Sequence, residues 1–337
     1  MMDSDGIRFR REEIVRRDIR DEHGRFIGRK SSSFLNGTLE TPVVDESSGV
    51  KNGASTAGFG HIYLTHDIDQ PFAWIRLCSV AKAILKNPLK ALNPILCYLG
   101  MRDDVDPYDS FDWLIKQDAR VVAALGEAKV TPVYFVMAHK KYAPHDGKPY
   151  LRSLAVKKLI RKLMAAGTEI GLHSSYQAGE NPNLVASEKE RLEKAVGRPV
   201  KWNRHHYLRT KEPEDMTALA KAGITDDFTL AYADVVGFRV GTCRPYKWHD
   251  SITGEETELT IHPLTIMECT LDMAKYMGLN ESDAFVKCKK MIDAVYKYSG
   301  DLVLLWHNTS VAKSSKSYHR RLYAKVLDYI IEKGSEK

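Results

Sequence analysis

Two aspartates separated by one residue follow a short apolar run, in the stretch HIYLTHDIDQPF that begins at position 61. Side chains two positions apart on a strand point to the same face, so Asp67 and Asp69 can converge on one point at the strand's end. One carboxylate can then bind a divalent metal while the other accepts a proton from metal-bound water. Such pairs also occur in helix caps and turns, so the chemistry needs support from other residues.

Polar groups stand at the ends of three other apolar runs. His173 follows the run EIGL, and a neutral imidazole is a good zinc ligand, although a histidine in such a place is often structural. Arg204 and Tyr207 end the run VKWNRHHY, and His307 ends the run DLVLLWH. In α/β folds, functional residues concentrate at the carboxyl ends of the strands. We therefore expect these side chains to meet the two aspartates at one site.

The elements that must position these residues form an alternating pattern from residue 61 onward. Six runs are typical of strands: 61–65, 130–138, 168–174, 200–207, 224–229 and 301–307. Three amphipathic runs between them are typical of helices: 111–128, 150–167 and 185–197. The second of these ends in Gly167, as helices commonly do. Strands alternating with helices of this length predict βαβ units, a parallel sheet and an α/β fold of the distorted barrel type.

Composition limits the class of protein. The 337 residues are 43% hydrophobic with a net charge of +6, which is enough for one large core and no indication of nucleic-acid binding. Five cysteines without a CxxC pair argue against a disulfide framework and a zinc knuckle. The charged N-terminus contains no signal-peptide core, and no apolar run approaches the roughly 18 residues of a membrane span. We therefore expect a cytoplasmic protein.

Three segments differ in character. Residues 1–60 are first charged and then rich in Ser, Gly and Thr, which predicts a loop-rich extension. Residues 61–337 are expected to form a single domain. Within it, residues 74–100 are basic and amphipathic and are interrupted by Pro88 and Pro94. This segment is interpreted as a helical insertion packed on the barrel, or as a lid or a membrane-surface contact for a lipid-linked substrate.

The motifs LTHDID, EIGLHSSY, RHHY and LLWH occur in an order that resembles the polysaccharide deacetylases with the NodB homology domain, carbohydrate esterase family 4. The resemblance covers roughly residues 61–310 and is strongest for a divergent branch with a THDVD opening, linked to bacterial surface-polysaccharide synthesis. It implies the deacetylase type of (β/α)-barrel and a divalent metal, with Zn²⁺ the first choice. It also implies that Asp67 is the catalytic base and that Asp69 is a metal ligand.

The second motif of that family carries two metal-binding histidines, and here only the first is matched. His173 is in place, but Gln177 stands four residues later, where a histidine is usual, and a glutamine oxygen is a poor zinc ligand. The candidates for the third ligand are His206 and His66. We favour His206, because the end of its strand should face the same opening.

The remaining two motifs supply the groups that orient and protonate. By resemblance, Arg204 holds the ionised Asp67 and the backbone N–H of Tyr207 helps to bind the oxyanion, although His206 replaces the usual proline between them. His307 is the implied general acid for the leaving amine. A carboxylate usually tunes that acid, and the sequence leaves its identity open among four residues: Asp226, Asp227, Asp234 and Asp250.

The function implied by this resemblance is metal-dependent removal of an N-acetyl group from an amino sugar. The sugar would belong to a surface polysaccharide such as O-antigen or capsule, or to its nucleotide- or lipid-linked precursor. Because Gln177 replaces a ligand, a non-catalytic carbohydrate-binding relative remains an alternative. A hydrolase of another non-peptide C–N bond is a further alternative, since it would use the same chemistry in a differently shaped pocket.

Overall fold

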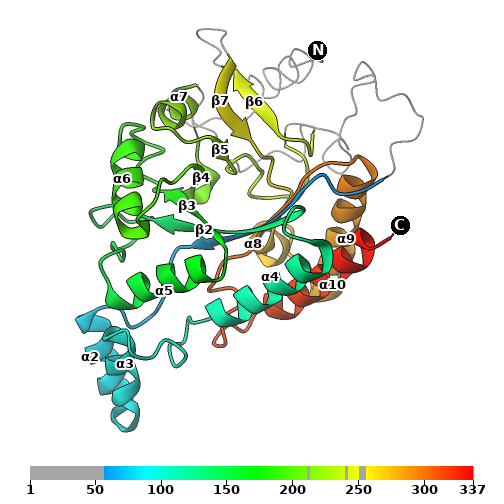
Figure 1. Ribbon diagram of the computed structural model, residues 1–337. Coiled ribbons are helices and arrows are strands. Elements are labelled where there is room, and N and C mark those ends of the chain that lie inside the picture. Colours follow the sequence, from blue (N-terminus) through cyan, green and yellow to red (C-terminus); the bar gives the residue numbers. More distant parts are fainter. Residues whose placement is uncertain (1–56, 211–212, 240–241, 250–255, 337) are drawn as a thin grey trace.

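The strands of the protein form one predominantly parallel sheet (Figure 1). The structure is a computed structural model that describes residues 57–210, 213–239, 242–249 and 256–336. Most of the N-terminal extension expected at 1–60 therefore lies outside the described residues. The strands are β1 (Ile62–Ile68), β2 (Val130–Met137), β3 (Glu169–Ser174), β4 (Trp202–His205), β5 (Asp226–Asp227), β6 (Tyr246–His249), β7 (Glu256–Ile261), β8 (Ile266–Met267) and β9 (Leu302–Leu305).

The order of strands across the sheet is β6-β7-β5-β4-β3-β2-β1-β9-β8. Every pair of neighbours is parallel except β6 and β7, which run antiparallel at one edge. The sheet curls with helices around it, so the expected α/β class and its distorted barrel form are confirmed. The sequence patterns missed β6, β7 and β8.

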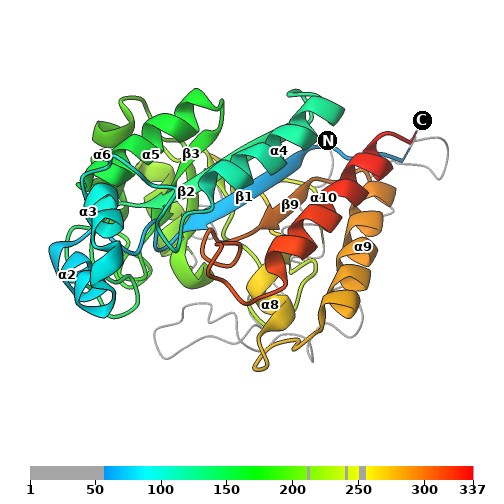
Figure 2. The same cartoon turned by 90° about the horizontal axis from the view of Figure 1, so that it is seen from below.

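The described residues also form helices, most of which surround the sheet. They are α2 (Leu77–Lys86), α3 (Leu92–Tyr98), α4 (Phe111–Leu125), α5 (Leu154–Ala165), α6 (Leu184–Val196), α7 (Glu214–Lys221), α8 (Glu268–Asp272), α9 (Glu281–Lys297) and α10 (His319–Gly334), with short 3₁₀ turns η3 (Pro88–Lys90) and η4 (His206–Leu208). Helices α4, α10 and α9 lie side by side (Figure 2). No helix in the described ranges is long and apolar enough to cross a membrane.

The alternation of side chains along each strand divides the core into two layers. On β2, Tyr134 and Val136 pack in the larger cluster shared with the helices, whereas Val133 and Phe135 belong to a smaller cluster inside the curled sheet. On β9, Leu302 and Leu304 belong to the first cluster, and Val303 and Leu305 belong to the second. Both faces of these strands are buried, which is why they read as continuous apolar runs.

This alternation also decides which polar residues face the interior of the barrel. Asp67 on β1 pairs in register with Phe135 on β2, whose ring lies in the inner cluster. His66, one position earlier, points to the helix side, where its ring nitrogens meet the Trp306 carbonyl and Asp118 of α4, each at 2.9 Å. Consequently Asp67 faces the site, and His66 is a structural residue of the outer layer.

Candidate active site

The inward-facing positions at the carboxyl ends of β1, β3, β4 and β9 meet at one place. These residues are Asp67 on β1 and Asp69 just after it, His173 on β3, Arg204 and His206 at the end of β4, and His307 after β9. His173 pairs in register with Arg204, so the two strand ends lie side by side. The sheet register therefore brings together groups that are up to 240 residues apart in the sequence.

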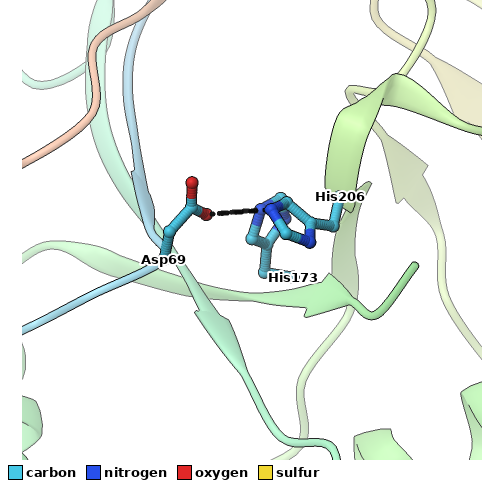
Figure 3. A group of neighbouring side chains, drawn as sticks. All are labelled: Asp69, His173 and His206. Atoms are coloured by element: carbon cyan, nitrogen blue, oxygen red, sulfur yellow. Dashed lines mark ion pairs between the residues drawn. The ribbon is translucent and has the colours of Figure 1, made fainter. Parts of the chain in front are cut away.

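Asp69, His173 and His206 form a cluster with the donor set of a metal site (Figure 3). The Oδ1 atom of Asp69 lies 3.2 Å from Nε2 of His173 and 3.7 Å from Nε2 of His206, and the three ligand atoms all lie within 4.8 Å of one another. Two imidazole nitrogens and one carboxylate oxygen form a common ligand set of catalytic zinc.

The hydrogen bonding of this cluster fits a site for a cation. Asp69 Oδ1 and His173 Nε2 are buried and have no hydrogen-bond partner among the described residues, because their 3.2 Å approach lacks hydrogen-bond geometry. Buried polar atoms are almost always paired, so unpaired atoms aimed at one point call for a further ligand. A divalent cation would satisfy both atoms.

Partners on the far side of each imidazole fix which nitrogen faces the cluster. His173 donates from Nδ1 to the Arg204 carbonyl at 2.9 Å, and His206 donates from Nδ1 to Asp146 at 2.8 Å. Both Nε2 atoms are therefore left as ligands, an arrangement common around metal-binding histidines. Burial alone would lower the pKa of His206, but the charges of Asp69 and Asp146 outweigh it and raise this pKa to about 9.

Asp146 is a residue of this site that the sequence analysis missed. It lies in the loop between β2 and α5, is buried, and accepts the backbone N–H groups of Tyr176 at 2.6 Å and Gln177 at 3.3 Å. The side chain of Gln177 itself is exposed and only its backbone contributes. The position that carries a ligand in the resembled family thus helps here to hold the carboxylate that orients His206.

Asp67 is buried and paired with a buried arginine. The Nη1 atom of Arg204 donates to Asp67 Oδ1 at 3.0 Å and to Thr65 Oγ1 at 2.7 Å, while its Nε donates to the Phe228 carbonyl at 3.0 Å. The guanidinium also lies over the ring of Phe135, 4.6 Å from its centroid. Desolvation of a buried ion pair is costly, and these additional contacts offset it.

The second oxygen of Asp67 remains directed at the site. It lies 3.6 Å from Nε2 of His173, on the same side as Asp69. Arg204 therefore occupies one carboxylate oxygen and leaves the other in position to accept a proton from a group at the metal cluster.

His307 is paired with Glu268, which corrects the sequence analysis. Oε1 of Glu268 accepts from Nδ1 of His307 at 2.8 Å and from its backbone N–H at 2.9 Å. Of the four aspartates considered, Asp226 binds His262 at 2.8 Å and Asp227 accepts from Asn203 at 2.7 Å. Asp250 lies outside the described residues.

The topology explains why Glu268 takes this position. It immediately follows β8, which pairs in parallel with β9, so both residues leave the sheet at the same end. Burial alone would lower the pKa of His307, but the Glu268 carboxylate outweighs it and raises this pKa to about 10. In return, His307 overcomes the effect of burial on Glu268 and lowers its pKa to about 2. His307 is thus held as an imidazolium, with Nε2 3.8 Å from Asp69.

Tyr207 lies at the rim, between two cavities of about 410 and 460 Å³. Asp69, His206 and Tyr207 line both cavities, and His307 lines the larger one. Tyr207 adopts a positive φ of 60°, and the residue is 53% exposed. Such a backbone is uncommon for a tyrosine and is typical of sites where surrounding contacts fix a strained conformation.

Comparisons with known proteins identify no family. No family model matches the chain, and no curated protein sequence matches it. Among solved structures, the chain is similar to a protein of Mycobacterium smegmatis assigned as a polysaccharide deacetylase, with 15% identity, a TM-score of 0.47, and coverage of 86% of this chain and 87% of the other. A protein of Pseudomonas aeruginosa PAO1 with the same assignment gives 14% identity, a TM-score of 0.48, and coverage of 80% and 85%.

The PuuE allantoinase is similar at the same level, with 14% identity, a TM-score of 0.46, and coverage of 82% of this chain and 85% of the other. Likeness of this degree says nothing about chemistry. The functional assignment below therefore depends on the side chains of this protein.

Proposed function

We propose that this protein is a metal-dependent hydrolase that removes the N-acetyl group from an amino sugar, within a bacterial surface polysaccharide or its precursor. One observation carries the proposal: a cluster with a metal-binding donor set lies between a buried carboxylate–arginine pair and an imidazole–carboxylate pair. A base on one side of a metal cluster and an acid on the other is the arrangement that amide hydrolysis requires.

Each residue has a role in this reaction. Asp69, His173 and His206 would hold the cation, and Zn²⁺ fits their donor set best. When bound, such a cation acts as a Lewis acid toward an amide carbonyl and acidifies water. The free oxygen of Asp67 accepts the proton of the attacking water, while Arg204 fixes the carboxylate.

The acid side of the site completes the reaction. His307 carries its proton at neutral pH because Glu268 raises its pKa to about 10, and it donates this proton to the nitrogen that leaves. In the proposal the backbone N–H of Tyr207 assists at the oxyanion. The C–N bond breaks, the acetyl carbon keeps the oxygen of the water, and the products are acetate and a free amino sugar.

The substrate class is supported by the surroundings of the cluster. The two adjoining cavities offer room for a sugar unit on either side of it. Tyr207, Tyr176 and His145 form an aromatic group at the rim, with ring centroids 4.1 to 5.6 Å apart. Aromatic faces of this kind suit the apolar faces of sugars. A precursor handled inside the cell fits the cytoplasmic location that we expect from the sequence.

Metal content and acetate release test the proposal together. Purified protein is expected to bind about one zinc per chain and to release acetate from an N-acetylated sugar linked to a nucleotide, a lipid or a polymer. Asp69→Ala should lose the metal, whereas Asp67→Asn should keep it and lose activity. Sugar binding by metal-loaded protein without any acetate release would favour a non-catalytic carbohydrate-binding protein. Release of another product would indicate a different non-peptide C–N bond.

A further inference from the structure

The α2–α3 hairpin, defined as residues 77–101, exposes an unusual share of the protein's apolar surface. It carries seven of the twelve large hydrophobic side chains that are exposed in the described residues, although it makes up under a tenth of them. Leu89 at its tip is 99% exposed and Leu85 is 81% exposed. The full set is Leu77, Leu85, Leu89, Leu92, Ile95, Leu99 and Met101. Exposed apolar side chains gathered on one short segment in this way indicate an interaction site.

The hairpin's attachment to the barrel does not use these side chains. Val80 and Cys97 face inward and are buried, and Cys97 donates to Asp106 at 3.3 Å. Asp106 in turn accepts the backbone N–H groups of Ala73 and Trp74 at 2.9 and 3.0 Å, just before α2. The base of the hairpin is therefore fixed by a buried carboxylate, and the leucines are left for another contact.

The charges beside these leucines all have one sign. Residues 74–102 contain no aspartate or glutamate. Lys82, Lys86 and Lys90 are exposed and form no ion pair within the described parts of the chain. Together with Trp74 and Asn93 they line a hollow of about 530 Å³. Such a hollow suits the phosphate of a lipid headgroup, and the neighbouring leucines suit the acyl chains beneath it.

The position of the hairpin permits contact with a large flat surface. It lies at the periphery of the molecule in both views, beyond α5 and away from α9 and α10 (Figures 1 and 2). The two residues just before the hairpin also adjoin the candidate active site, because Ile75 and Arg76 line the same cavity as Asp69 and His206. A surface that meets the hairpin would lie next to the mouth of that cavity.

We propose that the α2–α3 hairpin docks this protein on an anionic phospholipid bilayer, with its leucines inserted at the interface and its three lysines on the headgroup phosphates. This inference goes beyond the proposed reaction and stands whether or not the cluster is catalytic. Each lysine near an anionic surface contributes roughly a five-fold factor to binding, so three lysines give a factor on the order of 100.

Vesicle co-sedimentation of the full chain tests the proposal. Binding is expected to vesicles of phosphatidylcholine with 30% phosphatidylglycerol and to weaken strongly with added salt, while pure phosphatidylcholine binds poorly. The triple variant Lys82→Glu/Lys86→Glu/Lys90→Glu should lose at least about fifty-fold in affinity. The matched control Lys116→Glu/Lys201→Glu/Lys221→Glu changes three exposed lysines elsewhere, with the same change in net charge, and should lose much less.

Two further measurements separate docking from general electrostatic attraction. Leu85→Ser/Leu89→Ser should weaken vesicle binding at least ten-fold, whereas Val286→Ser, on the exposed face of α9, should leave it unchanged. Hydrogen exchange of wild-type protein should show residues 77–101 protected when anionic vesicles are added. The proposal is overturned if wild-type protein does not prefer anionic vesicles, or if the hairpin variants bind as well as wild type. It is also overturned if the leucines prove to join two copies of the chain and vesicle binding is absent.

Discussion

Replacing Glu268 by glutamine isolates the effect of its charge on His307. Glutamine has nearly the same shape, and its Oε1 can accept the same two hydrogen bonds from His307, at 2.8 and 2.9 Å in wild type. The substitution removes only the buried negative charge beside the ring of His307. A charge pair about 4 Å apart is worth about 4 kcal/mol at an effective dielectric constant of about 20, or about three pKa units. The pKa of His307 should therefore fall from about 10 to about 7.

The consequence for activity depends on pH. At pH 6 both proteins hold His307 protonated, and their rates should agree closely. At pH 9 the wild-type imidazole is still mostly protonated, while about 1% of the variant is, so acetate release should differ by about a hundred-fold. A bound cation offsets the charge of Asp69 and lowers the pKa of His307 in both proteins. The alkaline limbs of the two pH–rate profiles then shift in the same direction.

Nitrogen NMR of the His307 ring measures the same pKa without a substrate. The reasoning is refuted if the pKa in Glu268→Gln stays within half a unit of the wild-type value. Stability supplies an independent check, because the pKa of His307 is raised on folding. The pair therefore stabilises the fold fully between about pH 4.5 and 6.5 and loses that contribution as the pH rises toward 10. The difference in unfolding free energy between the two proteins should shrink over that range.

Other outcomes follow from the metal cluster and the packing beneath it. His206→Ala should lose bound zinc in equilibrium dialysis, whereas Gln177→Ala should retain it, because only the backbone of Gln177 contributes; zinc loss in both variants would contradict the assignment of His206. Asp146→Asn should weaken zinc affinity 10- to 100-fold, because Asp146 orients the ring of His206. Unchanged zinc affinity in this variant would contradict that role. Gly171→Ala places a Cβ against the ring of Phe135, closer than van der Waals contact allows, so chemical denaturation should show about 1–3 kcal/mol of lost stability. An unchanged stability would mean that the ring can move.

Long apolar runs made the central strands predictable from the sequence. Four strands are buried on both faces: β1, β2, β3 and β9. Each of them is therefore a nearly continuous hydrophobic run, which predicts a strand from the sequence alone. The spacing of Asp67 and Asp69 also predicted their common face, since both approach His173.

The missed features depend on contacts between distant parts of the chain. β8 has two residues, which is too short for any periodicity, and it is a strand only because β9 pairs with it. Glu268 becomes the partner of His307 through that pairing. Asp146 lies in a loop whose sequence has no pattern, and its role arises where two other loop residues donate to it. No local signal could have indicated either carboxylate.

Arg204 links the two halves of the site through different parts of one residue. Its guanidinium fixes Asp67, and its carbonyl oxygen fixes the ring of His173. Side-chain substitutions can therefore disconnect the carboxylate while the peptide group continues to aim the imidazole. No substitution at position 204 can remove the carbonyl that orients His173 and keep the contact with Asp67, since every amino acid has that carbonyl. In any variant that keeps β4 in register, the orientation of His173 should therefore be retained even where the pairing of Asp67 with residue 204 is lost.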